Sequence, residues 1–265
     1  MVEAATHFST IKPTRQGKQY EFLFKTVHSL GMMMQMKKKR VIIIGGDAAG
    51  LSAASSIRRS HEDWDIVVYE KGKYISYAAC GIPYYVADLV QDENTMITIT
   101  RETFLRKRNI PVKIFHEVLA VDTAAKEVHV ENVKAREEFK DTYDILVIAT
   151  GATPKLPSIP GIMHPRVFTV HGLDSGITIK QFIARNKPES VVLIGAGYIN
   201  LEMVEACHAA GIPNITMIKR SSRVLPSFAE KISSLVKQEL EKHGIPLIHG
   251  NPVTRLDSRD DGGVD

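Results

Sequence analysis

Two short apolar runs in this chain each lead directly into a glycine-containing turn. Val41-Ile-Ile-Ile44 is followed by Gly45-Gly46, and Val191-Val-Leu-Ile194 is followed by Gly195-Ala-Gly197. Continuous apolar runs rich in β-branched residues are typical of strands in a parallel sheet that is buried on both faces. Small and apolar residues after each turn predict a helix. The pattern therefore predicts an α/β protein made of two Rossmann-like, three-layer units.

The spacing of apolar residues predicts the remaining elements. Further strands are expected at residues 65–69, 110–121, 127–131, 144–149 and 215–218. Helices are expected at residues 103–108, 175–185 and 230–243, and another near Pro83 with Cys80 close to its N-terminus. Prolines after the strand at 144–149 indicate a linker. We expect a poorly ordered extension at 1–39, a first nucleotide-binding domain at 40–157 and a second at 158–265.

The first glycine turn has the order of elements that a dinucleotide site needs. Gly45 and Gly46 end a strand, Gly50 lies in the helix that follows, and Glu70 ends the next strand, 20 residues beyond Gly50. The helix N-terminus suits a pyrophosphate, and an acid at that distance suits ribose hydroxyls. Asp47 stands where the middle glycine of Gly-x-Gly-x-x-Gly is usual. A glycine turn without a ligand is the alternative.

The second turn differs from the first at the end of its second strand. Asn200 replaces the third glycine, and the strand ends in Lys219-Arg220 instead of an acid. An acid there binds a bare ribose, whereas bases suit a 2′-phosphate. NADPH is therefore favoured over NADH. The alternative is that the two basic residues are a solvated strand end.

Cys80 lies between the two turns and is followed by Gly81 and Pro83. The position of Cys80 between two nucleotide turns favours a redox-active thiol, and the dipole of a helix that begins there would lower the pKa of this thiol. A buried core cysteine is the alternative. No second cysteine stands at Cys-x-x-x-x-Cys spacing, so a disulfide of Cys80 needs an external thiol, or the residue cycles through sulfenic acid. Cys207, among apolar residues, is predicted to be structural.

Composition narrows the function classes. The chain has 265 residues, 44% hydrophobic, and a net charge of +4. The basic run at residues 37–40 has no interleaved aromatic residues, which favours a solvated chain end over a nucleic-acid patch. No apolar segment approaches the roughly 20 residues that span a bilayer, and no metal-ligand spacing is present. Two cysteines fit a reducing cytoplasm.

Together these residues resemble the pyridine nucleotide–disulfide oxidoreductases, in the single-cysteine branch of coenzyme A-disulfide reductases and NAD(P)H oxidases. The Gly-Gly-Asp-Ala-Ala-Gly turn is similar to the FAD turn of that branch. Ser76-Tyr77-Ala78-Ala79-Cys80 resembles its Ser-Phe-x-Asn-Cys form, with Tyr77 for Phe and Ala79 for Asn. Peroxidases and some oxidases carry a histidine where this chain has Ala48. That difference disfavours the peroxide-reducing and water-forming activities.

The resemblance implies FAD in the first unit, NADPH or NADH in the second, and electrons passing through Cys80 to coenzyme A disulfide. The residues it implies at FAD are Gly45, Gly46, Ala49, Gly50, Glu70, Lys71, Thr150 and Gly151. Those implied at NAD(P)H are Gly195, Gly197, Tyr198, Ile199, Glu202, Lys219 and Arg220. Those implied at the substrate are Ser52, Ser56, Arg59, Ser76 and Arg108, where ordinary surface arginines are the alternative.

The family also has a second FAD segment and a dimerisation domain, which this sequence lacks. The first unit is therefore expected to be incomplete, and the homodimer of the family is not expected of this chain alone. Three interpretations remain open. They are a coenzyme A-disulfide (or persulfide) reductase, an NAD(P)H oxidase acting on oxygen or sulfur species, and a truncated nucleotide-binding fragment without activity.

Overall fold

A computed structural model of the chain describes residues 38–221, 223–250 and 252–265. The predicted extension at 1–39 lies almost wholly outside them. The strands are β1 (Arg40–Ile44), β2 (Asp65–Glu70), β3 (Val112–Ile114), β4 (His116–Asp122), β5 (Glu127–Asn132), β6 (Glu137–Thr142), β7 (Ile145–Ile148), β8 (Ser190–Ile194), β9 (Asn214–Lys219) and β10 (Leu247–His249). The helices are α2 (Ala48–Ser60), α3 (Ile82–Val86), α4 (Arg101–Arg108), α5 (Leu173–Asn186), α6 (Tyr198–Ala209) and α7 (Glu230–Lys242), with short 3₁₀ helices at Ala79–Gly81 and Glu93–Met96.

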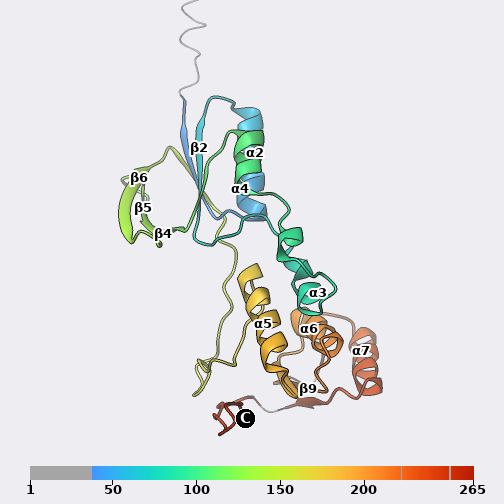
Figure 1. Cartoon of the computed structure of the whole chain (residues 1–265). Helices are drawn as coiled ribbons and strands as arrows, with labels where there is room; N and C mark the ends of the chain where they lie inside the picture. The colour runs from blue at the N-terminus through green and yellow to red at the C-terminus, as the bar shows by residue number, and fades with distance from the viewer. Residues whose placement is uncertain (1–37, 222, 251) are drawn as a thin grey trace, which may run out of the picture.

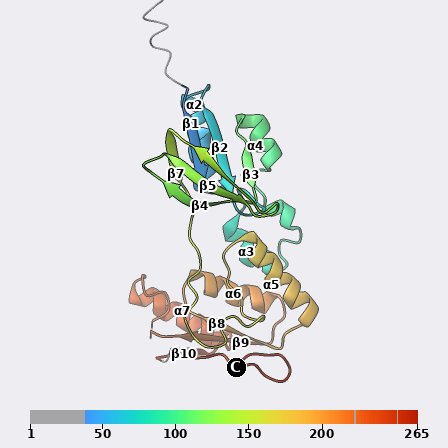
Figure 2. The same cartoon turned by 90° about the vertical axis from the view of Figure 1, so that its left-hand side faces the viewer.

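The first sheet has the strand order β3-β2-β1-β7, and all its strands are parallel. One face packs against α2 and α4, where Leu51, Ala54 and Phe104 are buried with the strand residues. The other face is covered by the antiparallel sheet β4-β5-β6, through Val128 and Val130. Figures 1 and 2 show these three layers in the upper part of the molecule. The continuous apolar run of β1 is explained by burial on both faces.

The prediction of one strand at residues 110–121 is wrong, because this segment forms two strands that belong to different sheets. β3 pairs with β2 in parallel, whereas β4 pairs with β5 antiparallel. Phe115 separates them with a φ of +59°, a left-handed conformation that turns the chain from one layer to the next. Strand β6 was not predicted, because Glu137–Thr142 is mostly charged and polar and faces solvent on one side. Helices α4 and α5 each begin two residues before their predicted starts.

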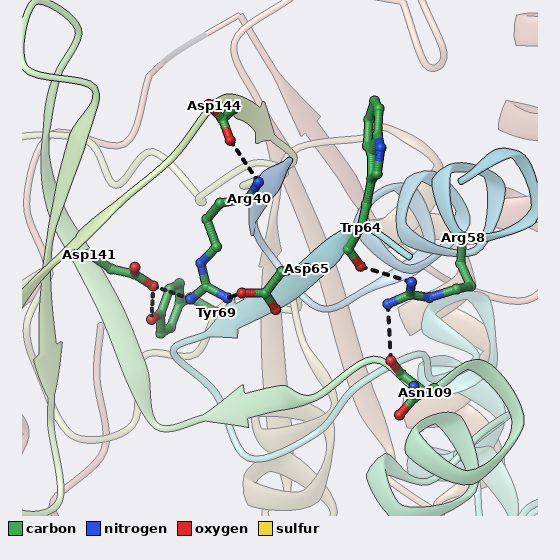
Figure 3. A network of polar contacts seen from close by, with 8 residues as sticks. All are labelled: Arg40, Arg58, Trp64, Asp65, Tyr69, Asn109, Asp141 and Asp144. Atoms are coloured by element: carbon green, nitrogen blue, oxygen red, sulfur yellow. Dashed lines mark hydrogen bonds and ion pairs between the residues drawn. The ribbon is translucent and has the colours of Figure 1, made fainter. Parts of the chain in front are cut away.

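A polar network fixes the layers of the first unit (Figure 3). The Arg40 guanidinium donates to Asp65 at 2.7 Å and to Asp141 at 2.5 Å, and the Tyr69 hydroxyl donates to Asp141 at 2.7 Å. These bonds join β1 and β2 to β6. Burial, followed by the Asp141 carboxylate, raises the pKa of Tyr69 above its ordinary value. The hydroxyl therefore stays protonated and donates to the carboxylate.

The second sheet has the order β10-β9-β8 and is also parallel. Helices α5, α6 and α7 contribute to a single apolar cluster on one face of it. Three residues on the other face are about half exposed: Val192 at 51%, Ile194 at 46% and Ile248 at 49%. Ile194 and Ile248 both stand opposite Ile218 of β9, so they form a row across the sheet. The α/β class with two Rossmann-like units is thus confirmed.

Residues 76–98, here called the cysteine loop, leave the first unit and pack into the second. A bridge between Tyr77 and Ile97 and a bond from the Thr98 amide to the Ser76 carbonyl (2.8 Å) close the base of the loop. Ile82, Tyr85, Val86 and Met96 are buried in the same cluster as helices α5 and α6. Figures 1 and 2 show α3 beside these helices. The core of the second unit therefore includes residues that precede residue 158.

In the described part of the chain, no helix combines the length and apolar character that crossing a membrane requires.

Candidate functional site

The first glycine turn brings the end of β1 and the start of α2 into close contact. Gly45 has a φ of +108°, and its amide donates to the Tyr69 carbonyl at 2.8 Å. A Cβ on Gly50 would lie 1.9 Å from the Gly45 carbonyl oxygen. Only glycine fits at either position, so the fold itself requires the close approach of helix and strand. The N-terminal amides of α2 consequently lie at the end of the sheet, where an anion can bind them.

Glu70 binds two backbone amides beside this turn. One of its carboxylate oxygens accepts from the Gly46 amide at 2.7 Å, and the other accepts from the Gly72 amide at 2.7 Å. A carboxylate has about four acceptor positions, so two remain available for ribose hydroxyls. Asp47 is the N-cap residue of α2, but its side chain makes no capping bond. The residues present therefore fit a dinucleotide, with Asp47 partly exposed at the turn.

The end of β7, which leads into Thr150 and Gly151, meets the same turn. The Ala149 amide donates to the Ile44 carbonyl at 2.8 Å, and a Cβ on Gly45 would lie 2.1 Å from the Ala149 carbonyl oxygen. Thr150 and Gly151 follow immediately and are exposed. Gly151 has a φ of +66°, and a Cβ on it would meet no atom within 4 Å. The structure thus brings Gly45, Thr150 and Gly151 together at one edge of the sheet.

The second turn repeats the geometry of the first. Gly195 has a φ of +115°, and its amide donates to the Ile218 carbonyl at 2.7 Å. Since Ile218 plays the part that Tyr69 plays in the first turn, Lys219 occupies the position of Glu70. Asn200 stands at the position of Gly50, and its amide nitrogen donates to the Ile194 carbonyl at 2.7 Å. The side chain that replaces the third glycine therefore ties the helix to the strand.

Lys219 and Arg220 differ sharply in exposure. Lys219 is buried, at 6% exposure, whereas Arg220 is exposed. Burial, and then the charge of Arg223, lower the pKa of Lys219. Within the described residues no carboxylate forms an ion pair with it. A buried ammonium beside a second cation is costly without an anion, which a phosphate group can supply.

Cys80 lies exposed in the 3₁₀ turn that leads into α3. The predicted helix near Pro83 is present, but it begins at Ile82, after the cysteine, and has five residues. Tyr77, at the base of the cysteine loop, lies beside the start of α5, because a Cβ on Gly172 would lie 3.3 Å from the Tyr77 hydroxyl oxygen. Burial, and then the charges of Asp47 and Glu70, raise the pKa of Tyr77 above its ordinary value. The cysteine loop therefore passes the start of α5 on its way into the second unit.

The predicted substrate residues fall into two groups. Ser52, Ser56 and Arg59 are exposed along one face of α2, at the spacing of helical turns. Arg58, next to Arg59, donates to the Asn109 carbonyl at 3.1 Å, so the ends of α2 and α4, with Arg108, lie side by side (Figure 3). Ser76 lies apart from them, with a φ of +43° and its hydroxyl 2.6 Å from that of Thr98.

The other predicted residues are exposed side chains near the two turns: Ala49, Lys71, Tyr198, Ile199 and Glu202. Gly197 is also exposed, with no atom within 4 Å of a Cβ built on it. Cys207 is 2% exposed, and burial raises its pKa to about 11, which fits the structural role predicted for it. Sequence reasoning missed Lys180, which contacts the cysteine loop from α5. That contact joins residues far apart in the chain, so no local motif marks it.

Comparison with known proteins identifies a family that this chain matches. The profile described as pyridine nucleotide-disulphide oxidoreductase matches residues 39–265. A CoA-dependent NAD(P)H sulfur oxidoreductase of Pyrococcus furiosus is 41% identical over 200 residues, 75% of this chain and 44% of that protein. A coenzyme A disulfide reductase of Staphylococcus aureus is 33% identical over 218 residues, 79% of this chain and 49% of that protein.

A solved structure extends the likeness to three dimensions. An engineered water-forming NADPH oxidase, derived from a Lactobacillus brevis enzyme and bound to NADPH, matches with a TM-score of 0.80 and 30% identity. The match covers 85% of this chain and 49% of that one. The chain thus spans about half the length of each of these proteins.

Proposed function

The chain belongs to the pyridine nucleotide-disulphide oxidoreductases, and we propose that it carries the nucleotide and thiol sites of an FAD-dependent NADPH oxidoreductase that reduces coenzyme A disulfide. A related disulfide or persulfide is the same substrate class. The observation that carries the proposal is the position of Cys80. Its thiol is exposed in a loop that follows β2 of the first nucleotide turn and whose helix packs into the second unit, beside the second turn.

The residues of the chain divide the chemistry between them. The first turn, with Glu70, Lys71, Thr150 and Gly151, would hold FAD, which supplies two-electron transfer between a nicotinamide and a disulfide. The Cys80 thiolate attacks one sulfur of coenzyme A disulfide, forming a mixed disulfide and releasing one coenzyme A thiolate. Two electrons from NADPH and one proton then convert the mixed disulfide into the Cys80 thiolate and a second coenzyme A thiol.

The second turn is proposed to favour NADPH over NADH because of Lys219. The residue stands where the first turn has its ribose-binding acid, and it is buried beside Arg223 without an acidic partner among the described residues. In the engineered NADPH oxidase, three consecutive substitutions replace an aspartate by alanine, an alanine by arginine and a methionine by serine. Arg220 and Ser221 have that same Arg-Ser order. Titration with NADPH and NADH, followed by protein fluorescence, measures the preference directly.

The substrate contacts are proposed at the two exposed helix ends and the cysteine loop. Arg59 and Arg108 offer guanidinium groups to the phosphates of coenzyme A, and Ser52, Ser56 and Ser76 offer hydroxyls. The free thiols suit a reducing compartment, and we propose the cytoplasm. The domain division at 157/158 stays a proposal, with the cysteine loop packed across it. A homodimer of the kind the family forms is not proposed for this chain alone.

A second candidate is an NAD(P)H oxidase that reduces oxygen or sulfur species, with Cys80 as a sulfenic or persulfide carrier. The likeness to the water-forming oxidase favours it, whereas Ala48 stands where peroxidases and some oxidases carry histidine. Oxygen consumption without a disulfide substrate distinguishes it from the reductase. The interpretation as a nucleotide-binding fragment without activity is not favoured, because the relatives are named as oxidoreductases.

The thiol step is tested by replacing each cysteine in turn. Cys80→Ser should keep the visible flavin absorption and lose NADPH-dependent reduction of coenzyme A disulfide. Cys207→Ser is the matched control, because that thiol is buried, and it should keep the turnover of the parent chain. Disulfide reduction that continues at the parent rate in Cys80→Ser would remove the thiol from the mechanism. If the purified protein shows no flavin absorption band after incubation with FAD, the proposal that FAD is its cofactor is refuted.

A further inference from the structure

Three contacts join Lys180 of α5 to the cysteine loop. Its Nζ lies 2.8 Å from the Asp88 carboxylate and 3.0 Å from the Val90 carbonyl oxygen, which accepts a hydrogen bond from it. The same ammonium sits 4.1 Å from the centre of the Tyr85 ring. Its side chain is only 19% exposed. A surface lysine of a helix would keep its ammonium in water, so this side chain is placed by the loop it contacts.

The three contacts hold the part of the loop that follows α3. Asp88 has a φ of +61°, a left-handed conformation that ends the helix and turns the chain back. Such a conformation is costly for a non-glycine residue and persists where surrounding contacts hold it. An ion pair, a bond to a carbonyl and a cation–π contact from one ammonium provide that support. Lys180 therefore fixes the C-terminal end of the helix whose N-terminal side carries Cys80.

The other end of α3 is fixed by close packing on the same helix α5. A Cβ on Gly176 would lie 2.8 Å from the Ile82 side chain, so this side chain packs directly against the glycine backbone. Ile82 is two residues beyond Cys80. Helix α5 thus contacts α3 at both ends, by Gly176 at the start and by Lys180 at the finish. A movement of α5 would carry the cysteine segment with it.

The second glycine turn belongs to the same packed cluster. Ala196, inside that turn, and Met203 of α6 are buried together with Ile82 and Val86. Cores are close-packed, so a shift in one member is felt by its neighbours. A nucleotide that binds the amides of this turn would fix α6, and with it the surface on which α3 rests.

We propose that Lys180 is a positioning residue that couples occupancy of the second nucleotide turn to the order of the cysteine loop. The proposal rests on the proposed function in one respect, that the second turn binds NADPH. Binding there stabilises the arrangement of α5, α6 and α3 in which Lys180 reaches Asp88 and Val90. Without the ammonium, NADPH still binds, but the loop no longer responds to it.

Hydrogen–deuterium exchange of peptides covering residues 76–98 tests this coupling. In the parent chain, saturating NADPH should slow exchange in these peptides, including the Ala87 amide that donates to Pro83. In Lys180→Met, which keeps the apolar stem, we expect exchange without NADPH to be about fivefold faster or more. NADPH should no longer change it. Lys180→Arg keeps a cation in reach of Asp88 and should restore at least part of the response.

Two further variants make the result specific. Lys237→Met is the matched control, because Lys237 is a helical lysine paired with Glu241 at 3.6 Å and should leave the loop unchanged. Asp88→Asn removes the partner carboxylate and should reproduce Lys180→Met, and it serves if the lysine variant does not fold. The enhanced fluorescence of bound NADPH, measured on the same samples, reports affinity separately. Binding with equal protection of the loop in the parent chain and Lys180→Met overturns the coupling, whereas no binding to the parent chain overturns the proposed function.

Discussion

Replacing Gly197 by alanine tests whether the fold or a bound ligand requires glycine at this position. A Cβ on Gly197 meets no atom within 4 Å, and its φ of −91° is ordinary for alanine. In such a place alanine gains about 0.4–1 kcal/mol through the unfolded chain. Gly197 is also the N-cap of α6, where glycine is preferred over alanine by a similar amount, so the two effects nearly cancel and the fold itself has little net need of glycine here. Close approach of a pyrophosphate to the backbone would account for it.

The expected cost of the alanine then falls mainly on binding. A methyl group that intrudes on a closely packed partner costs about 1–3 kcal/mol, and each 1.4 kcal/mol is about tenfold in Kd. We expect Gly197→Ala to weaken NADPH binding about tenfold or more, measured by fluorescence titration, while the melting temperature stays nearly the same. Gly50, in the first turn of α2, offers the opposite case, because its Cβ would lie 1.9 Å from the Gly45 carbonyl oxygen.

Gly50→Ala is therefore the matched control for stability. It should lower the melting temperature by about 2–4 °C for each kcal/mol of overpacking. Unchanged NADPH affinity in Gly197→Ala would refute the assignment of this turn to the nucleotide. A large loss of stability in the same variant would refute the conclusion that its surroundings are open.

Two predictions concern stability. Burial raises the pKa of Cys207 to about 11, so the contribution of this thiol to stability should be complete below pH 9 and be lost, by about 2–3 kcal/mol, as the pH rises through 11. In Cys207→Ala, urea titrations should show that part of the alkaline loss missing, and a pH profile identical to that of the parent chain would contradict it. Asp141→Asn should destabilise the first unit by about 1–3 kcal/mol, because Arg40 loses a charged acceptor and Tyr69 a charged partner. The control Glu241→Gln, in an exposed ion pair, should cost a few tenths of a kcal/mol. Equal urea midpoints for the two variants would show that the network carries no stability.

The sequence predicted the parts of the site that local chemistry determines. The turns at Gly45 and Gly195 need left-handed glycines after a buried strand, and Glu70 follows at the distance that one helix and one strand impose. These constraints act within a few dozen residues, so they can be read in order along the chain. The exposed position of Cys80 fits the same interpretation, since Gly81 and Pro83 mark the turn before α3.

Features that depend on distant residues were not predictable. The break at Phe115 looks like the middle of a strand, because a left-handed aromatic residue carries no sequence signal. Strand β6 is mostly charged, since its partner β5, not its own composition, makes it a strand. Lys180 looks like one more lysine on an amphipathic helix until Asp88 is placed beside it.

The burial of Ile82 and Met96 in the cluster of the second unit has a thermodynamic consequence. The two units lose their independence, because residues of the cysteine loop, which leaves the first unit, complete the interior of the second. A calorimetric trace of this chain should accordingly contain one endotherm instead of two. A proteolytic nick in the segment between β7 and α5 should leave both pieces associated until the whole assembly unfolds.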